Sequence, residues 1–301
     1  MNWLHIVILA IVQGLAELLP VSSSAHVIVV AKLMQKHMEL KFDPSSPEMT
    51  LLLVMLHTGT MFAVILYFWR AWKNSIFASR AVFKQQAIRL ITATMLTAVV
   101  GWPLIKGIEK GMEKSGYLVK DASGHLPKAE IESLFSNLGL VAGALFAAGV
   151  LILIAGLVKR ATDRNRTIGI REALWIGAVQ GLCLPFRGFS RSGATISTGL
   201  LLGVLKARAE EFSFALAVII TPAAIWREVG RLVEAHQAAG HFNVTWSLFG
   251  PSLLGMVCAF LAGLLALRWL SRWLESGRWY VFGIYCLVAA SAAFALHCRG
   301  Y

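Results

Sequence analysis

Charged residues are scarce in this sequence, and acidic residues are the scarcer of the two kinds. Asp, Glu, Lys and Arg make up 15% of the 301 residues, whereas about 25% is usual for a soluble globular protein. Apolar residues reach 57% instead, in runs long enough to cross a membrane, of which 138–158 and 249–270 are the clearest. This balance excludes an ordinary soluble domain and predicts an all-α polytopic membrane protein, with 1–301 as a single integral membrane domain.

The shortage of acids leaves a net charge of +12, which by itself would fit a nucleic-acid-binding protein. The basic residues instead gather in short segments between apolar runs, which is the distribution that orients a membrane protein. We therefore expect no nucleic-acid partner. The segments expected at the cytoplasm are 70–89, 159–171 and 268–278, and those expected outside are 36–50, 106–136 and 227–248.

Cysteine is also rare, and its four residues are scattered along the chain. They have neither the spacing of metal ligands nor the pattern of a disulfide framework. The amino-terminal apolar run has no basic residues before it and continues into Glu17, so we expect it to be retained rather than removed as a signal peptide.

Six apolar segments predict full transmembrane helices: 51–69, 88–105, 138–158, 212–226, 249–270 and 279–297. Four further pieces are short for a span, and Pro, Ser or Gly interrupts them in pairs: 3–19 with 25–35, and 172–185 with 194–205. The charges of the flanking loops require each pair to enter and leave the membrane on one side. We therefore expect two re-entrant helical hairpins, 3–35 from the outside and 172–205 from the cytoplasm.

The two hairpins share a short repeat. Val12-Gln13-Gly14-Leu15 recurs as Val179-Gln180-Gly181-Leu182, 167 residues later, and a proline and a serine-containing turn follow each copy. Related hairpins of opposite orientation predict an inverted-topology repeat, with repeat one about 1–158 and repeat two about 170–297. Irregular backbone at membrane depth must be buried by protein or line a cavity, so the two hairpin tips should meet and form the site.

Both tips carry polar residues that suit an anion. The candidates in the first tip are Gln13, Glu17, Ser22, Ser23, Ser24 and His26, and those in the second are Arg187, Ser190, Arg191, Ser192, Gly193 and Thr195. A new half-helix starts at each tip, and its unpaired N–H groups and dipole favour a phosphate, for which Arg191 offers a planar fork. Since a charge at mid-membrane costs on the order of 2.5–3.5 kcal/mol, Glu17 and Arg191 are predicted to be functional.

Several of these residues also have plain structural interpretations. Gln13 and Gln180 are more simply explained as contacts between hairpins, and Arg187 could snorkel or pair with an acid. His57 stands alone in an apolar segment and is more simply a satisfied interior histidine. Any single serine could hydrogen-bond only the backbone, as serines in membrane helices often do.

On these residues the sequence resembles the undecaprenyl-diphosphate phosphatase family, also known as the bacitracin-resistance protein family. The signatures of that family are (E/Q)-x-x-x-E running into P-V-S-S-[ST]-[GA]-H, and P-G-x-S-R-S-G-A-T. They match Gln13 to His26 and Gly188 to Thr195, and the similarity extends over nearly the whole chain. The resemblance implies hydrolysis of undecaprenyl diphosphate to undecaprenyl phosphate and inorganic phosphate, which recycles the lipid carrier for peptidoglycan synthesis and gives bacitracin resistance.

The resemblance also implies a divalent cation, Mg²⁺ or Ca²⁺, a site facing the periplasm of a bacterial inner membrane, and a homodimer. The family's essential acid maps to Glu17, the expected metal ligand, and its motif serines, histidine and arginine motif map to Ser22, Ser23, His26, Ser190, Arg191 and Ser192. Two departures stand out: many members have Glu at the position of Gln13, and Arg187-Gly188 replaces the usual Pro-Gly.

Two mechanisms and a second function stay open at this stage. Ser23 could act as the nucleophile, with His26 relaying a proton and Glu17 holding the cation or serving as base. A metal-activated water would need no serine nucleophile. Broken helices in inverted repeats are also typical of transporters, so a lipid-carrier flippase or secondary transporter using the same site is the alternative function.

Overall fold

The computed structural model describes residues 3–37, 47–114, 137–158, 168–186, 188–239 and 246–299. These residues form ten α-helices and no β-strand. In chain order the helices are α1 (Trp3–Leu18), α2 (Ser23–His37), α3 (Pro47–Ser75), α4 (Arg80–Lys114), α5 (Leu138–Leu157), α6 (Ile170–Cys183), α7 (Arg191–Leu201), α8 (Lys206–Ala239), α9 (Trp246–Glu275) and α10 (Trp279–Cys298).

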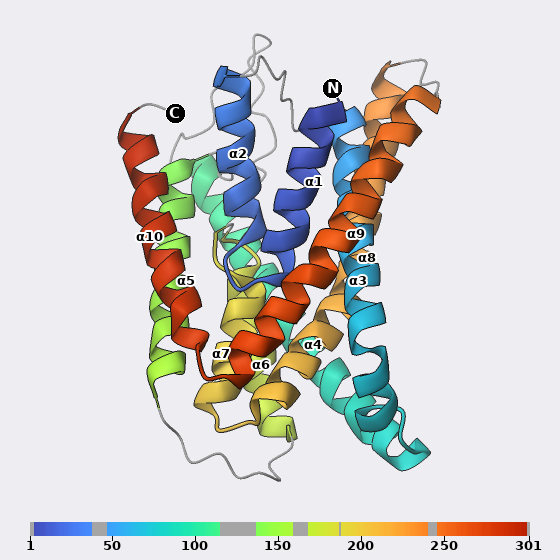
Figure 1. Ribbon diagram of the computed structural model, residues 1–301, viewed down its shortest axis with the longest axis vertical. Helices are drawn as coiled ribbons and strands as arrows, with labels where there is room; N and C mark the ends of the chain where they lie inside the picture. The colour runs from blue at the N-terminus through green and yellow to red at the C-terminus, as the bar shows by residue number, and fades with distance from the viewer. Residues whose placement is uncertain are drawn as a thin grey trace.

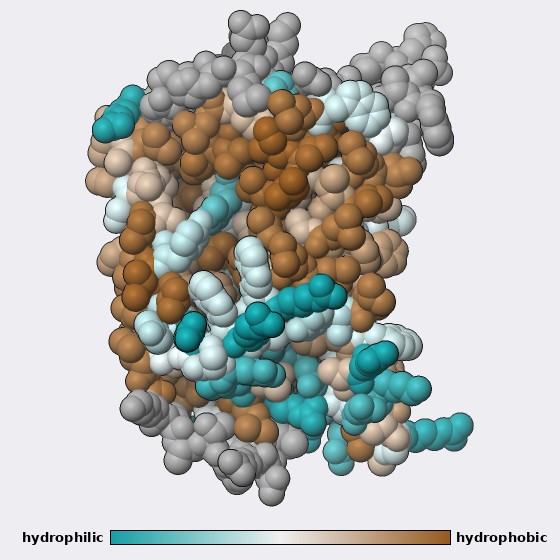
Figure 2. Space-filling view, in the orientation of Figure 1, coloured by the Kyte–Doolittle hydropathy of each residue, from teal (hydrophilic) through white to brown (hydrophobic). Residues whose placement is uncertain are grey.

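Five helices of the described part are long and apolar enough to cross a membrane: α3, α4, α5, α9 and α10. Five of the six expected spans fall on these helices. The sixth, 212–226, lies in α8 and includes side chains outside the described part, so it stays a prediction. Most of the visible surface in Figure 2 is apolar, and hydrophilic side chains gather toward one end. The chain is therefore a multi-pass membrane protein.

Two pairs of shorter helices turn back part of the way along the molecule (Figure 1). α1 and α2 approach from the end at which α10 ends, and α6 and α7 approach from the opposite end, which we call the basic end because segments 70–89 and 268–278 lie there. The bounds of these four helices agree with the four short apolar pieces expected from the sequence.

The turns of the two hairpins are in contact. Ser192 Oγ in α7 lies 3.4 Å from the carbonyl oxygen of Leu19 in the first turn. A Cβ on Gly193 would lie 3.2 Å from Pro20 Cβ and 2.7 Å from Ile152 Cδ1, so a larger residue at position 193 would force the tips apart. The prediction that the two tips meet is confirmed.

The repeated Val-Gln-Gly-Leu segment packs each hairpin on a long helix in the same way. A Cβ on Gly14 in α1 would lie 2.6 Å from the carbonyl oxygen of Ala259 in α9. A Cβ on Gly181 in α6 would lie 2.8 Å from the carbonyl oxygen of Thr97 in α4. Small residues of this kind let helix backbones approach closely in a membrane protein. The matched packing supports the inverted repeat, whose two halves stay a prediction.

We expect Gly14→Leu to destabilise the protein by about 1–3 kcal/mol or more, the usual cost of inserting volume into a packed interior. The added side chain would meet backbone of α9, which cannot swing aside as a flexible side chain does. Thermal unfolding of the purified protein in detergent measures the effect. The matched control is Gly143→Leu in α5, where a Cβ meets nothing within 4 Å. Equal melting temperatures for the two variants would contradict the prediction.

Candidate active site

The first hairpin turn places a strained residue at the start of α2. Proline at position 20 prevents the helix from continuing, and Ser22 then adopts a left-handed backbone conformation with φ 66°. Its hydroxyl lies 3.4 Å from the Ala25 N–H and so caps α2. A non-glycine residue in this conformation costs about 1–3 kcal/mol and is found most often at functional sites. This turn reverses the chain, and Ser23 at the start of α2 reaches Glu17 in α1.

Glu17 is the centre of the hydrogen bonds that join the two tips. Ser23 Oγ donates a short hydrogen bond to its Oε2, and Gln13 Nε2 donates to the same oxygen at 3.1 Å. Arg191 Nη2 from the second hairpin lies 3.1 Å from Oε1. The Glu17 side chain is 15% exposed and the Arg191 side chain 27%, so the pair is shielded but remains open to a ligand. The Glu17 carboxylate thus brings a hydroxyl group and a guanidinium group together at one site.

Gln13 connects this group to α3. Its Nε2 lies 3.4 Å from His57 Nε2, and His57 Nδ1 donates to the carbonyl oxygen of Leu53 at 2.8 Å. A carbonyl accepts only, so neutral His57 carries its proton on Nδ1 and accepts from Gln13 through Nε2. Both amide hydrogens of Gln13 are then used, and its amide oxygen remains for a ligand. His57, expected to be an interior residue, therefore belongs to the surroundings of the site.

His26 is held away from Ser23. Its Nδ1 donates to the carbonyl oxygen of Ser22 at 2.8 Å, and its Nε2 accepts from the hydroxyl of Tyr285 at 2.7 Å. The His26 and Tyr285 rings also stack with centroids 5.6 Å apart. Both ring nitrogens are thus engaged, and the hydroxyl of Ser23 is hydrogen-bonded to Glu17. This arrangement favours Glu17 over His26 as the proton acceptor for Ser23.

The second tip presents Arg191 from the first turn of α7. Ser190 is the N-cap of α7, and its side chain accepts from the Gly193 N–H at 3.2 Å. Thr195 is fully buried, and its hydroxyl bonds the carbonyl oxygen of Arg191 at 2.9 Å and Ser213 Oγ at 2.5 Å. Ser190 and Thr195 therefore hold α7 in position, whereas Arg191 faces the first tip.

The remaining predicted residues divide between the tip and its support. Ser24 Oγ lies 3.4 Å from Ser22 Oγ at the start of α2. Ser192 contacts the first turn, and Gly193 allows that contact. Arg187 lies outside the described residues.

Two residues of the site were not predicted, His57 and Tyr285. A polar side chain inside an apolar helix signals function, and that signal was present at His57. Tyr285 gave no such signal, because aromatic residues are common in membrane helices and its partner His26 lies 259 residues away in sequence.

An apolar cavity of about 370 Å³ opens beside the first tip, between α1, α9 and α10. Leu15, Leu19 and Val21 line it from the hairpin, and Trp269 and Phe282 line it from the long helices. His26 and Tyr285 also line this cavity, at the side where it reaches the turn. The polar site thus borders a space suited to a hydrocarbon chain.

The polar atoms at the tips suit a divalent cation that protein oxygens and substrate oxygens would coordinate together. Among the residues that the structure describes, no three His, Cys, Asp or Glu side chains cluster as a metal site. Glu17 and the Gln13 amide oxygen are hard oxygen donors, and Mg²⁺ is usually held by one or two carboxylates together with substrate phosphates and waters. The donors therefore fit a cation that a phosphate ligand helps to hold, and do not form an all-protein cage.

Comparison with known proteins shows the family of this chain. A family model described as "Bacitracin resistance protein BacA" matches residues 6–292. The chain is 54% identical over 299 residues to "Undecaprenyl-diphosphatase 2" of Acinetobacter baylyi, covering 98% of each chain. It is also 32% identical to "Undecaprenyl-diphosphatase 2" of Burkholderia thailandensis, with 100% of this chain and 97% of the relative covered. Since the match covers nearly the whole chain, both tips included, this protein belongs to the bacitracin resistance protein BacA family.

Proposed function

We propose that this protein hydrolyses undecaprenyl diphosphate to undecaprenyl phosphate and inorganic phosphate where the two hairpin tips meet. The observation that carries the proposal is the joining of Glu17, Ser23 and Arg191, from both tips, into one hydrogen-bonded group. Relatives of this chain are named undecaprenyl-diphosphatases, and the family is named for bacitracin resistance. The activity would recycle the lipid carrier for peptidoglycan synthesis and lower sensitivity to bacitracin.

The diphosphate is bound by Arg191 and the first turns of α2 and α7. Both helices begin at the tips, so their N-terminal N–H groups and the positive ends of their dipoles favour an anion there. One nitrogen of Arg191 pairs with Glu17, and the other N–H donors of the guanidinium remain for phosphate oxygens. These groups stabilise negative charge on the phosphoryl group during transfer.

Ser23 and Glu17 carry the chemistry. Glu17 takes the proton of Ser23 while Oγ attacks the terminal phosphorus, and the bond from that phosphorus to the bridging oxygen breaks. Undecaprenyl phosphate leaves, and water then hydrolyses the phosphoserine, releasing phosphate and restoring the hydroxyl. Mg²⁺ or Ca²⁺, held by Glu17, Gln13 and the phosphates, would neutralise charge on their oxygens.

The apolar cavity between α1, α9 and α10 takes the first part of the prenyl chain. The rest of the chain extends into the membrane, consistent with the apolar outer surface (Figure 2). We place the protein in the bacterial inner membrane, with six full spans, two re-entrant hairpins and the basic end in the cytoplasm. The site then opens toward the periplasm, from which the first hairpin enters. A homodimer stays a prediction.

The matched packing of the two hairpins also suits the alternative function, a lipid flippase or secondary transporter. The chemical groups, however, do not repeat. The residue 167 positions after Glu17 is Leu184, so the second hairpin has no acid at the equivalent place. A hydrolytic centre needs a single set of reacting groups, and this asymmetry favours the enzyme.

The test is phosphate release from undecaprenyl diphosphate by the purified protein in detergent. We expect release that a chelator abolishes and that added Mg²⁺ or Ca²⁺ restores, because one carboxylate and an amide leave much of the diphosphate charge unneutralised. Lipid movement is measured in parallel in liposomes. Folded protein that moves the lipid without releasing phosphate, whatever the cation, would favour the transporter and reject the phosphatase.

A further inference from the structure

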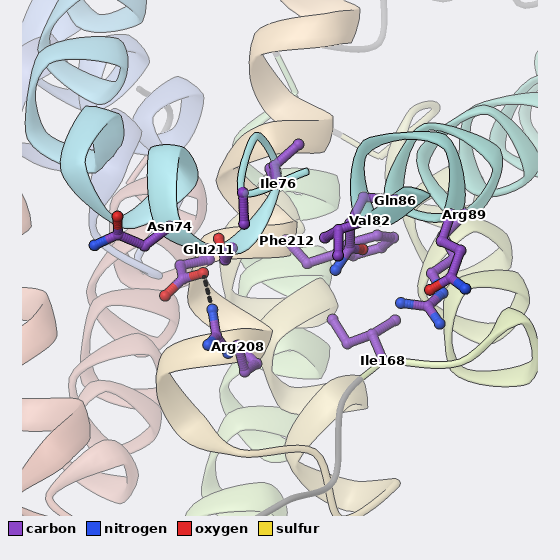
Figure 3. A pocket seen from close by; sticks show the side chains of 12 residues that line it. Asn74, Ile76, Val82, Gln86, Arg89, Ile168, Arg208, Glu211 and Phe212 are labelled. Carbon is purple, nitrogen blue, oxygen red and sulfur yellow. Dashed lines mark hydrogen bonds and ion pairs between the residues drawn. The ribbon is translucent and has the colours of Figure 1, made fainter. Parts of the chain in front are cut away.

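A second cavity, which has charged residues in its wall, lies at the basic end, away from the hairpin tips. It has a volume of about 260 Å³ and is lined by residues of α3, α4 and α8 and of the α3–α4 turn. Figure 3 shows Arg89 reaching it from α4 and Arg208 reaching it from α8, with Phe212 between them. The site proposed above uses none of these residues.

The charge of this cavity is positive. Arg208 Nη1 pairs with Glu211 at 2.8 Å, which leaves the other N–H donors of that guanidinium available. Within the described part of the chain, Arg89 takes part in no ion pair. The wall thus carries two guanidinium groups and one carboxylate, for a net charge of +1. The segment 70–89 contains five basic residues and no acid, which adds to the positive potential.

Ser75, one of the residues that line the cavity, also has an unpaired hydroxyl. Ser75, the last residue of α3, has a buried Oγ without a hydrogen-bond partner among the described residues. Buried polar atoms in proteins are nearly always hydrogen-bonded, so an unpaired one calls for an explanation such as a ligand. The amides of Gln85 and Gln86 line the same cavity. Residues with hydroxyl, amide and guanidinium donors thus surround one space, and they come from three helices, α3, α4 and α8.

Three exposed aromatic rings lie close in sequence to residues that line this cavity. Phe77 lies 6.3 Å from Trp69 and 5.6 Å from Phe83, between ring centroids. The three residues are 52%, 54% and 47% exposed, respectively. Their chain neighbours Ile76 and Val82 line the cavity itself. Trp is enriched at the level of lipid headgroups, so Trp69 supports a position of this end of α3 near the membrane interface.

We propose that this cavity binds the phosphate of an anionic phospholipid in the membrane leaflet at the basic end. The proposal rests on the membrane orientation given above but not on the hydrolytic activity. Basic cavities between membrane helices on the cytoplasmic side are suited to lipid headgroups. A phosphodiester carries a single negative charge, which matches the wall charge of +1. A phosphate monoester carries a charge of about −1.5 to −2, of which a wall charge of +1 would neutralise only a part.

Native mass spectrometry of the full-length protein, with phosphatidylglycerol titrated into detergent micelles, tests the proposal. We expect one phosphatidylglycerol to stay bound, with phosphatidylcholine at the same concentration retained far less. Arg89→Gln should weaken this binding about fivefold or more, the effect of one basic residue near an anionic headgroup. Ser75→Ala should weaken it by a smaller factor and serves as a second variant if Arg89→Gln fails to fold.

Lys84→Gln is the matched control, because it removes one positive charge from the same segment at an exposed position that does not line the cavity. An equal loss of binding in the Lys84 and Arg89 variants would show that phosphatidylglycerol responds only to the general surface charge, and it would overturn the proposal. Full displacement by inorganic phosphate, or preferential retention of undecaprenyl phosphate, would also overturn it in favour of those ligands. Phosphate release by Arg89→Gln in lipid-free detergent should equal that of the wild type, so the two proposals fail separately.

Discussion

Glu17→Gln should lower the rate of phosphate release by about 10²–10⁴-fold, the usual contribution of a positioned acid or base. The amide keeps the size of the side chain but cannot take the proton of Ser23. It also cannot hold the charge of Arg191, which now lies 3.1 Å from the carboxylate. Single-turnover release of phosphate from undecaprenyl diphosphate measures the chemical step.

Glu109→Gln is the matched control for this prediction. Glu109 is also a carboxylate paired with a cation, Lys106 at 2.8 Å, but it lies toward the far end of α4 and takes no part in the site. Its phosphate release should stay within about twofold of the wild type. A Glu17→Gln protein that is folded and retains more than about a tenth of the wild-type rate would contradict a role in the chemistry.

Ser23→Ala then distinguishes two roles for Glu17, activation of the Ser23 hydroxyl and activation of a water molecule. If the hydroxyl is the nucleophile, the variant loses as much activity as Glu17→Gln, and the phosphoserine that acid quenching traps in the wild type disappears. Substantial turnover by Ser23→Ala would instead show that Glu17 activates water. The short hydrogen bond between Ser23 and Glu17 favours the first result.

The hairpins could be predicted from sequence because their determinants are local. Pro20 and the serines after it break one helix and start the next, and Ser190 with Gly193 does the same at the second tip. Loop charge predicts the side of the membrane from which each hairpin enters. Even the contact between the tips followed from a general requirement, since irregular backbone inside a membrane must be covered by protein.

The partners within the site depend on packing between distant helices, which local pattern does not encode. Ser23 and His26 are three residues apart, which places their side chains only about 60° apart around α2, so the spacing alone is compatible with a proton relay between them. Ser23 reaches Glu17, and His26 reaches Tyr285 in α10. Similarly, His57 acquires its role only because α3 passes beside Gln13.

Arg191→Ala should lower phosphate release by about 10²–10³-fold, as does removal of one donor that stabilises transition-state charge. The variant also leaves Glu17 shielded and unpaired, which can cost up to about 3–5 kcal/mol of stability. Activity and stability therefore fall together, and the single variant does not separate a substrate contact from a purely structural ion pair. Release of phosphate and thermal unfolding must be measured on the same preparations.

Arg191→Lys and a second substitution in Arg191→Ala separate these two roles. Lysine keeps the charge and therefore much of the stability, but it loses the planar fork and should remain well below the wild-type rate. In Arg191→Ala with Glu17→Leu no charge is left unpaired, so the melting temperature should recover while phosphate release does not. If Arg191→Lys instead turned over at the wild-type rate, the guanidinium would serve only to neutralise Glu17. The phosphate would then have to be bound by the first turns of α2 and α7 alone.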